Sequence, residues 1–169
     1  METGEELRFD PGAGTPARLK RQLSRLASMT AAQMTRVSRE ALRAAGARKD
    51  HFVVLAALAE FGPMSQAGLS DRTSVYRSDL VSVLNDLEDG GSVRRAPDPA
   101  DKRRNVITIT EHGRRRLAEL DRVLDGVNEH IMTPLDPDER TRLFDLLNRI
   151  NTHLATAAGG TGLPDREIP

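Results

Sequence analysis

The sequence contains no cysteine and no tryptophan, and aromatic residues make up only 3% of its 169 positions. Without cysteine there can be no disulfide, no thiolate metal ligand, no cysteine nucleophile and no peroxide sensing through a thiol. So few aromatic side chains also argue against a surface on which the bases of single-stranded nucleic acid would stack. The composition therefore excludes thiol chemistry and disfavours single-strand binding.

The sequence also lacks an excess of charge of either sign, because 25 lysine and arginine residues balance 25 aspartate and glutamate residues. No overall field attracts nucleic acid, so any contact with DNA depends on where the arginines cluster. No apolar run approaches the roughly 18 residues of a membrane span, and the acidic N-terminus differs from a signal peptide. We therefore expect a cytoplasmic protein with no membrane partner.

The distribution of apolar residues, glycine and proline predicts one domain that is mainly helical, with a small β-hairpin. Residues 1–16 and 157–169 are rich in glycine and proline and are expected to be flexible tails around a domain at 17–156. Helical spacing and a switch to alternation predict helices at 17–45 (either one long helix or a broken one), 48–60, 66–71, 77–89, 111–131 and 137–156, and strands at 92–95 and 105–109.

Two short helices followed by a hairpin give the outline of a winged helix-turn-helix, in which the hairpin is the wing. Ser65 is the expected N-cap of the first short helix, and Thr110 and Asp136 are the expected N-caps of the two helices that follow the wing. The apolar stripe that should bury the inner face of the second short helix consists of Leu80, Val81, Leu84 and Leu87.

The wing is the most basic segment of the chain. A hairpin projects side chains from a narrow base, and arginine suits the negative potential of a narrow minor groove. Asp101 would hold an arginine in a bidentate pair and so aim it at the groove. The alternative is a solvated basic turn, but the preceding helix-turn-helix favours DNA. The basic residues concerned are Arg94, Arg95, Lys102, Arg103 and Arg104.

The helix at 77–89 is the predicted recognition helix, because such a helix reads bases with its N-terminal residues. The candidate DNA-binding residues on it are Arg77, Ser78, Asp79 and Ser82. Asp79 has three interpretations: it reads a cytosine amino group, it pairs with Arg72 or Arg77, or it provides favourable negative charge at a helix N-terminus.

No catalytic or metal-binding constellation is found in the sequence. The four histidines fall on different predicted helices, without the spacing of metal ligands. No serine lies in a nucleophile elbow, and no glycine-rich phosphate loop follows a strand. We therefore expect no enzyme activity and no cofactor.

The stretch from Ala47 to Gly113 resembles the MarR family of transcriptional regulators. The resemblance is carried by HFVVLAALAEFGPMSQAGL, RSDLVSVLNDLEDGG and VRRAPDPADKRRNVITITEHG. It implies a winged helix at about 47–113 and a homodimer formed by helices at about 17–45 and 111–156. It also implies that Arg103, aimed by Asp101, enters the minor groove, and that Ser78, Asp79 and Ser82 occupy base-reading positions.

The chain departs from the family pattern at the start of the recognition helix. Tyr76 stands where the family usually has Asp or Ser, and tyrosine is a poor N-cap. Asp79 and Ser82 replace a common Thr and a common Arg, and Gly68 replaces a usual Glu that would complete a capping box with Ser65. These changes affect the expected operator sequence and affinity rather than the class of protein.

The resemblance further implies a repressor that binds a pseudo-palindromic operator and is released by a small aromatic or phenolic effector. The effector crevice would be lined by His51, Phe52, Leu55 and the start of the helix after Thr110, and ordinary core packing is the alternative. A different class is also open, a winged-helix module that binds protein without specific DNA binding. The neutral net charge and the acidic residues Asp79, Asp86, Glu88 and Asp89 speak for that alternative.

Overall fold

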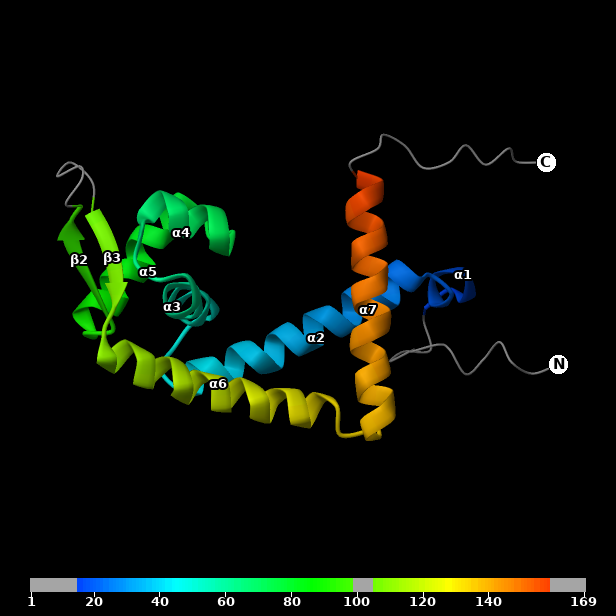
Figure 1. Ribbon diagram of the computed structural model, residues 1–169. Helices are drawn as coiled ribbons and strands as arrows, with labels where there is room; N and C mark the ends of the chain where they lie inside the picture. Colours follow the sequence, from blue (N-terminus) through cyan, green and yellow to red (C-terminus); the bar gives the residue numbers. More distant parts are fainter. Residues whose placement is uncertain (1–14, 99–104, 159–169) are drawn as a thin grey trace. The chain divides into compact units, whose positions relative to one another are not determined.

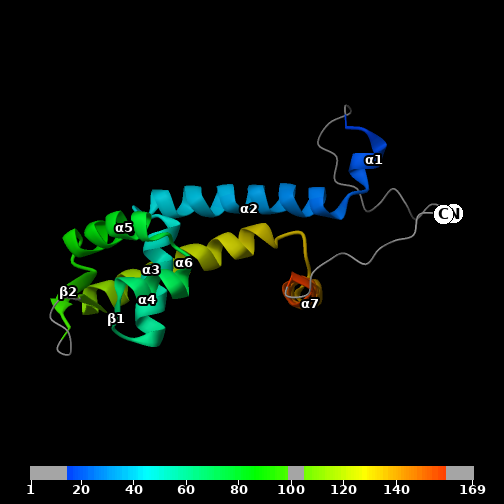
Figure 2. The same cartoon turned by 90° about the horizontal axis from the view of Figure 1, so that it is seen from above.

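The structure is a computed structural model that describes residues 15–98 and 105–158. Its mainly helical fold with one small antiparallel sheet confirms the predicted fold class. The chain falls into two units, Met1–Val127 and Asn128–Pro169, which are divided inside α6. The elements are α1 (Ala17–Lys20), α2 (Leu23–Ala44), α3 (Lys49–Phe61), β1 (Met64–Ser65), α4 (Gln66–Thr73), α5 (Arg77–Asp89), β2 (Val93–Pro97), β3 (Asn105–Ile109), α6 (Glu111–Ile131) and α7 (Pro137–Ala158), labelled in Figure 1 except for β1, which is labelled in Figure 2.

The predicted boundaries of α5, β3 and α6 are those of the structure, while those of other elements differ by a few residues. The helix expected at 17–45 is interrupted at 21–22, which separates α1 from α2. The strand expected at 92–95 lies at 93–97. The sequence did not predict β1, because two residues are too few to show alternation. It pairs with β3 and completes a sheet of order β1-β3-β2.

The expected N-caps are present at three helices. The backbone N–H of Gly68 donates to Oγ of Ser65 (3.2 Å), and the N–H of Gly113 donates to Oγ1 of Thr110 (3.0 Å). At α7, the side chains of Asp136 and Glu139 each accept a hydrogen bond from the other residue's backbone N–H (2.9 Å both ways). This reciprocal pair is a capping box.

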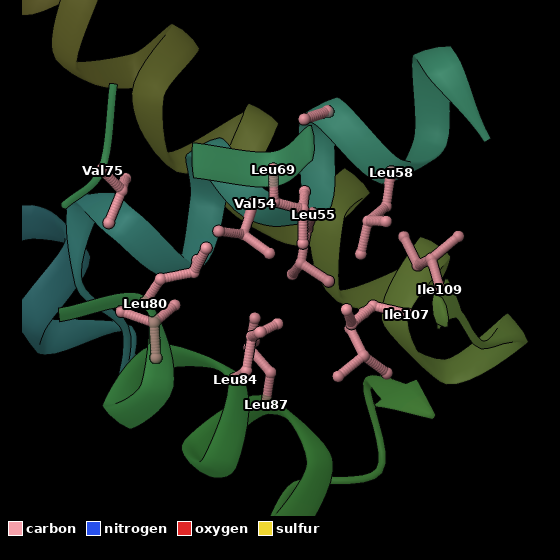
Figure 3. Close-up of a cluster of buried hydrophobic side chains, with 13 residues drawn as sticks. Val54, Leu55, Leu58, Leu69, Val75, Leu80, Leu84, Leu87, Ile107 and Ile109 are labelled. Carbon is pink, nitrogen blue, oxygen red and sulfur yellow. The ribbon is translucent and has the colours of Figure 1, made fainter. Parts of the chain in front are cut away.

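The larger apolar core surrounds α3, which contacts α4, α5 and β3 (Figure 3). The helical spacing of Phe52, Leu55, Ala56 and Ala59 in the sequence predicts that they form one apolar face of α3. That prediction is wrong in part. Because α4, α5 and β3 pack on different sides of α3, they bury residues beyond a single stripe. The buried residues of α3 are Val54, Leu55, Ala57 and Leu58.

The inner face of α5 also differs from the prediction by one residue. Val81, which was assigned to the apolar stripe, is 47% exposed, whereas Val83 is only 1% exposed. Residues three and four positions apart share one side of a helix, so Leu80, Val83, Leu84 and Leu87 form the buried stripe. Val81 therefore belongs to the outward-facing part of α5.

A smaller apolar cluster joins the end of α2, the start of α3 and the middle of α6. Leu42, Ala47 and Leu120 are buried in it, with Phe52 and Leu124 packed against them. Leu42 is the one buried residue of α2. Figure 2 shows α2 extending away from α3, so that only its last turns reach this cluster.

The wing is attached to α6 by a close approach of backbone. The carbonyl oxygen of Ser92, a buried residue before β2, accepts a hydrogen bond from the backbone N–H of Thr110 (3.0 Å). A Cβ atom added to Gly113 would lie 2.0 Å from that same oxygen and 2.8 Å from Cγ1 of Ile109. The Thr-x-x-Gly start of α6 is thus explained by space, because only glycine allows α6 to pack this closely on Ser92.

We predict that Gly113→Ala lowers the free energy of unfolding by at least about 1–3 kcal/mol, as overpacking of a tight site does. Thermal or denaturant unfolding followed by circular dichroism measures the change. The matched control is Gly126→Ala in the same helix, where an added Cβ meets nothing within 4 Å. That control should raise stability by up to about 1 kcal/mol, since alanine favours a helix over glycine. Equal stability of the two variants would contradict the packing argument.

Candidate nucleic-acid interface

The candidate surface begins on the outer side of α5. The buried stripe of α5 holds this helix against the core, which leaves the residues on its other sides in solvent. The four residues predicted to meet DNA are all exposed, namely Arg77, Ser78, Asp79 and Ser82. A recognition helix needs its first two turns free in this way to enter a groove of the duplex.

The N-terminus of α5 carries the most exposed large side chain on this surface. Tyr76 is 79% exposed, and its side chain makes no capping hydrogen bond, as its poor capping ability predicts. Asp79 accepts a hydrogen bond from Oγ of Ser78 (3.3 Å). The guanidinium of Arg72 lies 4.2 Å above the ring centre of Phe61. Within the described residues no arginine pairs with Asp79, so helix-terminal charge and base reading remain as its interpretations.

A groove of about 660 Å³ runs beside α5, toward the sheet. Arg77, Val81 and Asn85 form one of its walls, since residues four apart lie along one side of a helix. The start of α4 and the strands contribute the other lining residues, which are Ser65, Gln66, Ala67, Arg95, Asn105 and Ile107. The exposed Val81 is therefore part of a surface shared by α5 and the wing.

The wing places its two arginines of β2 differently. Arg94 is exposed, whereas the side chain of Arg95 is 24% exposed and makes hydrogen bonds to Glu88 and Asn85 of α5. Asp101, Lys102, Arg103 and Arg104, predicted to carry the minor-groove contact, lie outside the described residues. Their role stays a prediction from the sequence.

A charged cluster on another side of α5 was not predicted from the sequence. Asp86 accepts from the guanidinium of Arg48 and lies 3.3 Å from Nε2 of His51. Nδ1 of His51 accepts from the backbone N–H of Arg48 (3.4 Å), and Nε2 lies within hydrogen-bond distance of both the guanidinium of Arg48 (3.4 Å from Nε) and Asp86 (3.3 Å). These three residues, the Asp86 cluster, join the start of α3 to α5. No sequence signal marks it, because Arg48 and Asp86 are 38 residues apart.

The protonation of His51 is set mainly by its burial. Burial lowers the pKa of His51, the hydrogen bond with Asp86 opposes that change, and the charge of Arg48 lowers the pKa further. The neutral imidazole is thus the form that the fold favours.

A cavity of about 250 Å³ lies next to the Asp86 cluster. His51 and Leu55, two of the three residues predicted to bind an effector, line it, whereas Phe52 packs in the smaller apolar cluster instead. The predicted contribution from the start of α6 consists of His112 and Arg116. The remaining lining residues are Gly46, Ala47, Asp86, Leu87, Gly90, Ser92 and Leu120.

The described parts of the chain contain neither a metal-binding cluster nor a helix that could cross a membrane. No group of three or more histidine, aspartate or glutamate side chains there is arranged to hold a metal ion. Among the helices described, none combines the length and the apolar character needed to cross a membrane.

The chain is similar in sequence and in fold to known transcriptional regulators. The family model of the MarR family matches residues 47–104. Transcriptional regulator HosA of Escherichia coli O111:H- is 29% identical over 102 residues, which are 60% of this chain and 76% of HosA. The HTH-type transcriptional repressor NicR of Pseudomonas putida is 31% identical over 99 residues, 59% of this chain and 63% of NicR. A mutant of E. coli MarR complexed with operator DNA has 25% identity and a TM-score of 0.64, over 76% of this chain and 92% of that one.

The lowered pKa of His51 predicts how stability depends on pH. Below about pH 6.5, an ordinary histidine in the unfolded chain binds a proton that folded His51 resists. The free energy of unfolding should therefore fall as the pH is lowered from 6.5 toward the pKa of the folded state. Denaturant unfolding at a series of pH values measures this, and His51→Gln should flatten the dependence. The control His153→Gln, on an exposed position of α7, should leave it intact. A flat profile for the parent protein would contradict the assignment.

Proposed function

The chain belongs to the MarR family of DNA-binding transcriptional regulators, and from this premise we propose that it is a repressor that binds a pseudo-palindromic operator as a homodimer. The observation that carries the proposal is the exposed outer face of α5, which is held on the winged helix-turn-helix beside the wing. The relative NicR, described as a repressor, supports the direction of control. The operator complex of E. coli MarR supports the class of DNA site.

In the proposed complex, α5 enters the major groove and the wing reaches the minor groove. Ser78 and Ser82 are small donors that allow a close approach to base edges, and Arg77 beside the helix N-terminus would contact phosphate. Arg94 adds positive charge on the exposed face of β2. Arg103, aimed by Asp101, would be the groove-inserting residue, with Lys102 and Arg104 on the flanking phosphates.

The proposed homodimer is supported by the apolar side of α7. Its large apolar side chains are 42% to 58% exposed in the single chain, an arrangement that water disfavours. They recur at helical spacing, so a second copy of the chain could cover them along one stripe. These residues are Phe144, Leu146, Leu147, Ile150 and Leu154. Two-fold symmetry would then set half-sites about one helical turn apart, ~10 bp.

We place the proposed effector, a small aromatic or phenolic acid, in the cavity beside the Asp86 cluster. Arg116 and His112 line it with groups that can bind a carboxylate or phenolate, and Leu55 contributes an apolar surface. Asp86 belongs to α5, so a ligand in this cavity would touch the helix that meets DNA. That contact is the physical route by which binding of the effector would change DNA affinity.

The alternative of a protein-binding module has less support. Two of the acidic residues that favoured it form ion pairs, Asp86 with Arg48 and Glu88 with Arg95. They therefore do not present a free acidic patch to a partner protein, which leaves only Asp79 and Asp89 of the original four.

The first prediction concerns DNA binding. The protein should shift duplex DNA from upstream of its own gene with two chains per site, and affinity should fall steeply with salt because phosphates are neutralised. Arg103→Ala should weaken binding by about 1–3 kcal/mol, and Arg36→Ala, an exposed arginine of α2, should not. Mobility shifts at two salt concentrations measure both. Arg103→Ala binding as tightly as the parent would refute the proposed wing contact.

The second prediction concerns the effector. In a thermal-shift screen of small aromatic acids and phenols, at least one compound should raise the melting temperature and release DNA. A ligand at about 100 times its Kd would add roughly 2.7 kcal/mol of stability. His112→Ala should reduce the shift, whereas His153→Ala on α7 should preserve it. Equal shifts in the two variants would place the ligand elsewhere.

A further inference from the structure

The guanidinium of Arg95 is engaged by α5. Nη1 donates to Oε2 of Glu88 (2.8 Å), and Nη2 donates to Oδ1 of Asn85 (2.8 Å). The backbone N–H of Arg95 also donates to Oε1 of Glu88 (3.0 Å). The three residues, which we call the Arg95 brace, thus connect the backbone and the side chain of β2 to the recognition helix.

The path of the chain makes this connection local. After α5 the chain reverses at Gly90 and Gly91, where Gly91 adopts a φ of +69°. The backbone N–H of Ser92 then donates to the carbonyl of Leu87 (2.7 Å), so β2 starts beside the last turn of α5. Seven residues separate Glu88 from Arg95, and this short loop brings them together.

The alternation of β2 separates the two arginines. Side chains two positions apart in a strand lie on the same face, so Arg95 shares the face of the buried Val93. Arg94 lies on the opposite, exposed face. Arg95 is therefore directed toward the protein, although its neighbour in sequence is free to meet DNA.

A contact of Arg95 with phosphate would require breaking the brace. That movement would leave the carboxylate of Glu88 without its partner beside a negatively charged duplex. The bidentate fork of arginine, by contrast, fits a carboxylate and an amide oxygen at fixed angles. Both considerations favour the bonded arrangement in the complex with DNA.

We propose that Arg95 is a positioning residue that sets the wing at a fixed angle to α5, rather than a DNA contact. The wing and α5 enter different grooves, so binding requires both in the correct relative position. Without the brace, the wing is not held at this angle in the free protein. Binding must then fix it at a cost in conformational entropy, which weakens the affinity for DNA although no phosphate contact is removed. This inference rests on the proposed contact of the wing with DNA.

Three variants distinguish an effect of the charge of Arg95 on DNA affinity from an effect of its position in the brace. Arg95→Ala removes a positive charge, Glu88→Ala removes a negative one, and the double variant restores the net charge without the brace. If Arg95 acts by positioning, all three bind the preferred duplex about fivefold to tenfold more weakly than the parent. The double variant should bind DNA no more weakly than either single variant, because the two residues act as one unit and removing either one already breaks the brace.

The dependence of affinity on salt gives a second readout. The slope of log affinity against log salt should be the same for the double variant and the parent, because the same phosphates are neutralised. A phosphate-binding Arg95 predicts instead that Glu88→Ala tightens binding and that Arg95→Ala lowers the slope by about one. Either of those two results would overturn the proposal, as would parental affinity of the double variant.

The matched control is the double variant Arg36→Ala/Glu40→Ala, which removes an exposed ion pair of α2. It should bind DNA within about twofold of the parent. Circular dichroism establishes that each variant is folded at the assay temperature. Should Arg95→Ala fail to fold, Asn85→Ala removes one acceptor of the brace from an exposed position and should still weaken binding severalfold. Parental affinity of that variant would then count against the brace.

The outcomes for the brace and for the wing contact are distinct. If Arg103→Ala binds like the parent, the proposed wing contact fails. If Arg103→Ala is weakened but the Arg95/Glu88 double variant is not, the wing contact stands and the brace fails.

Discussion

The packing of the apolar stripe of α5 against α3 and the sheet is the contact on which the remaining structure depends. Leu80 and Leu84 are fully buried there, so the direction of every other side chain of α5 is set by them. Because the inner side of the helix is apolar and buried, its polar outer side has to face solvent. The surface that meets DNA in this family is in that sense a consequence of the core.

Polar contacts then fix α5 on two further sides. The Asp86 cluster ties it to the start of α3, and the contacts of Arg95 with Glu88 and Asn85 tie it to β2. Exposed ion pairs add little to stability on their own, so their main effect here is geometric. The cavity is lined by Asp86 of the first of these ties, so the proposed effector site and the proposed recognition helix share a residue.

The base of the wing adds a constraint of a different kind. Gly113 has no side chain, and the carbonyl of Ser92 occupies the space where a Cβ would lie. This close approach of backbone joins the wing to α6, and Oγ1 of Thr110 adds hydrogen bonds to the carbonyls of Gly91 (2.6 Å) and Ser92 (3.2 Å). The start of α6 and the start of β2 are therefore packed without space between them, which is the condition for a close-packed, rigid junction.

Local patterns in the sequence predicted most of the elements and the starts of several helices. Helical spacing identified α5, alternation identified β3, and the hydroxyl or carboxylate caps at Ser65, Thr110 and Asp136 marked helix starts, because each of these signals lies within a few residues. The motif of the wing also indicated the family. The sequence was less informative at the edge of an apolar stripe, where helical spacing does not decide which residue is buried. In α5 the predicted Val81 is exposed and Val83 is buried in its place.

Contacts between distant residues were decided only by the tertiary structure. The pairing of Arg48 and His51 with Asp86, the two-residue strand β1 and the lining of the cavity depend on packing of separate segments, for which a single sequence carries no period or spacing. Charge follows the same rule. The sequence shows that 25 basic residues balance 25 acidic ones over the whole chain. It does not show which of them pair, and only the fold distinguishes an arginine that pairs with Glu88, such as Arg95, from an exposed one such as Arg94.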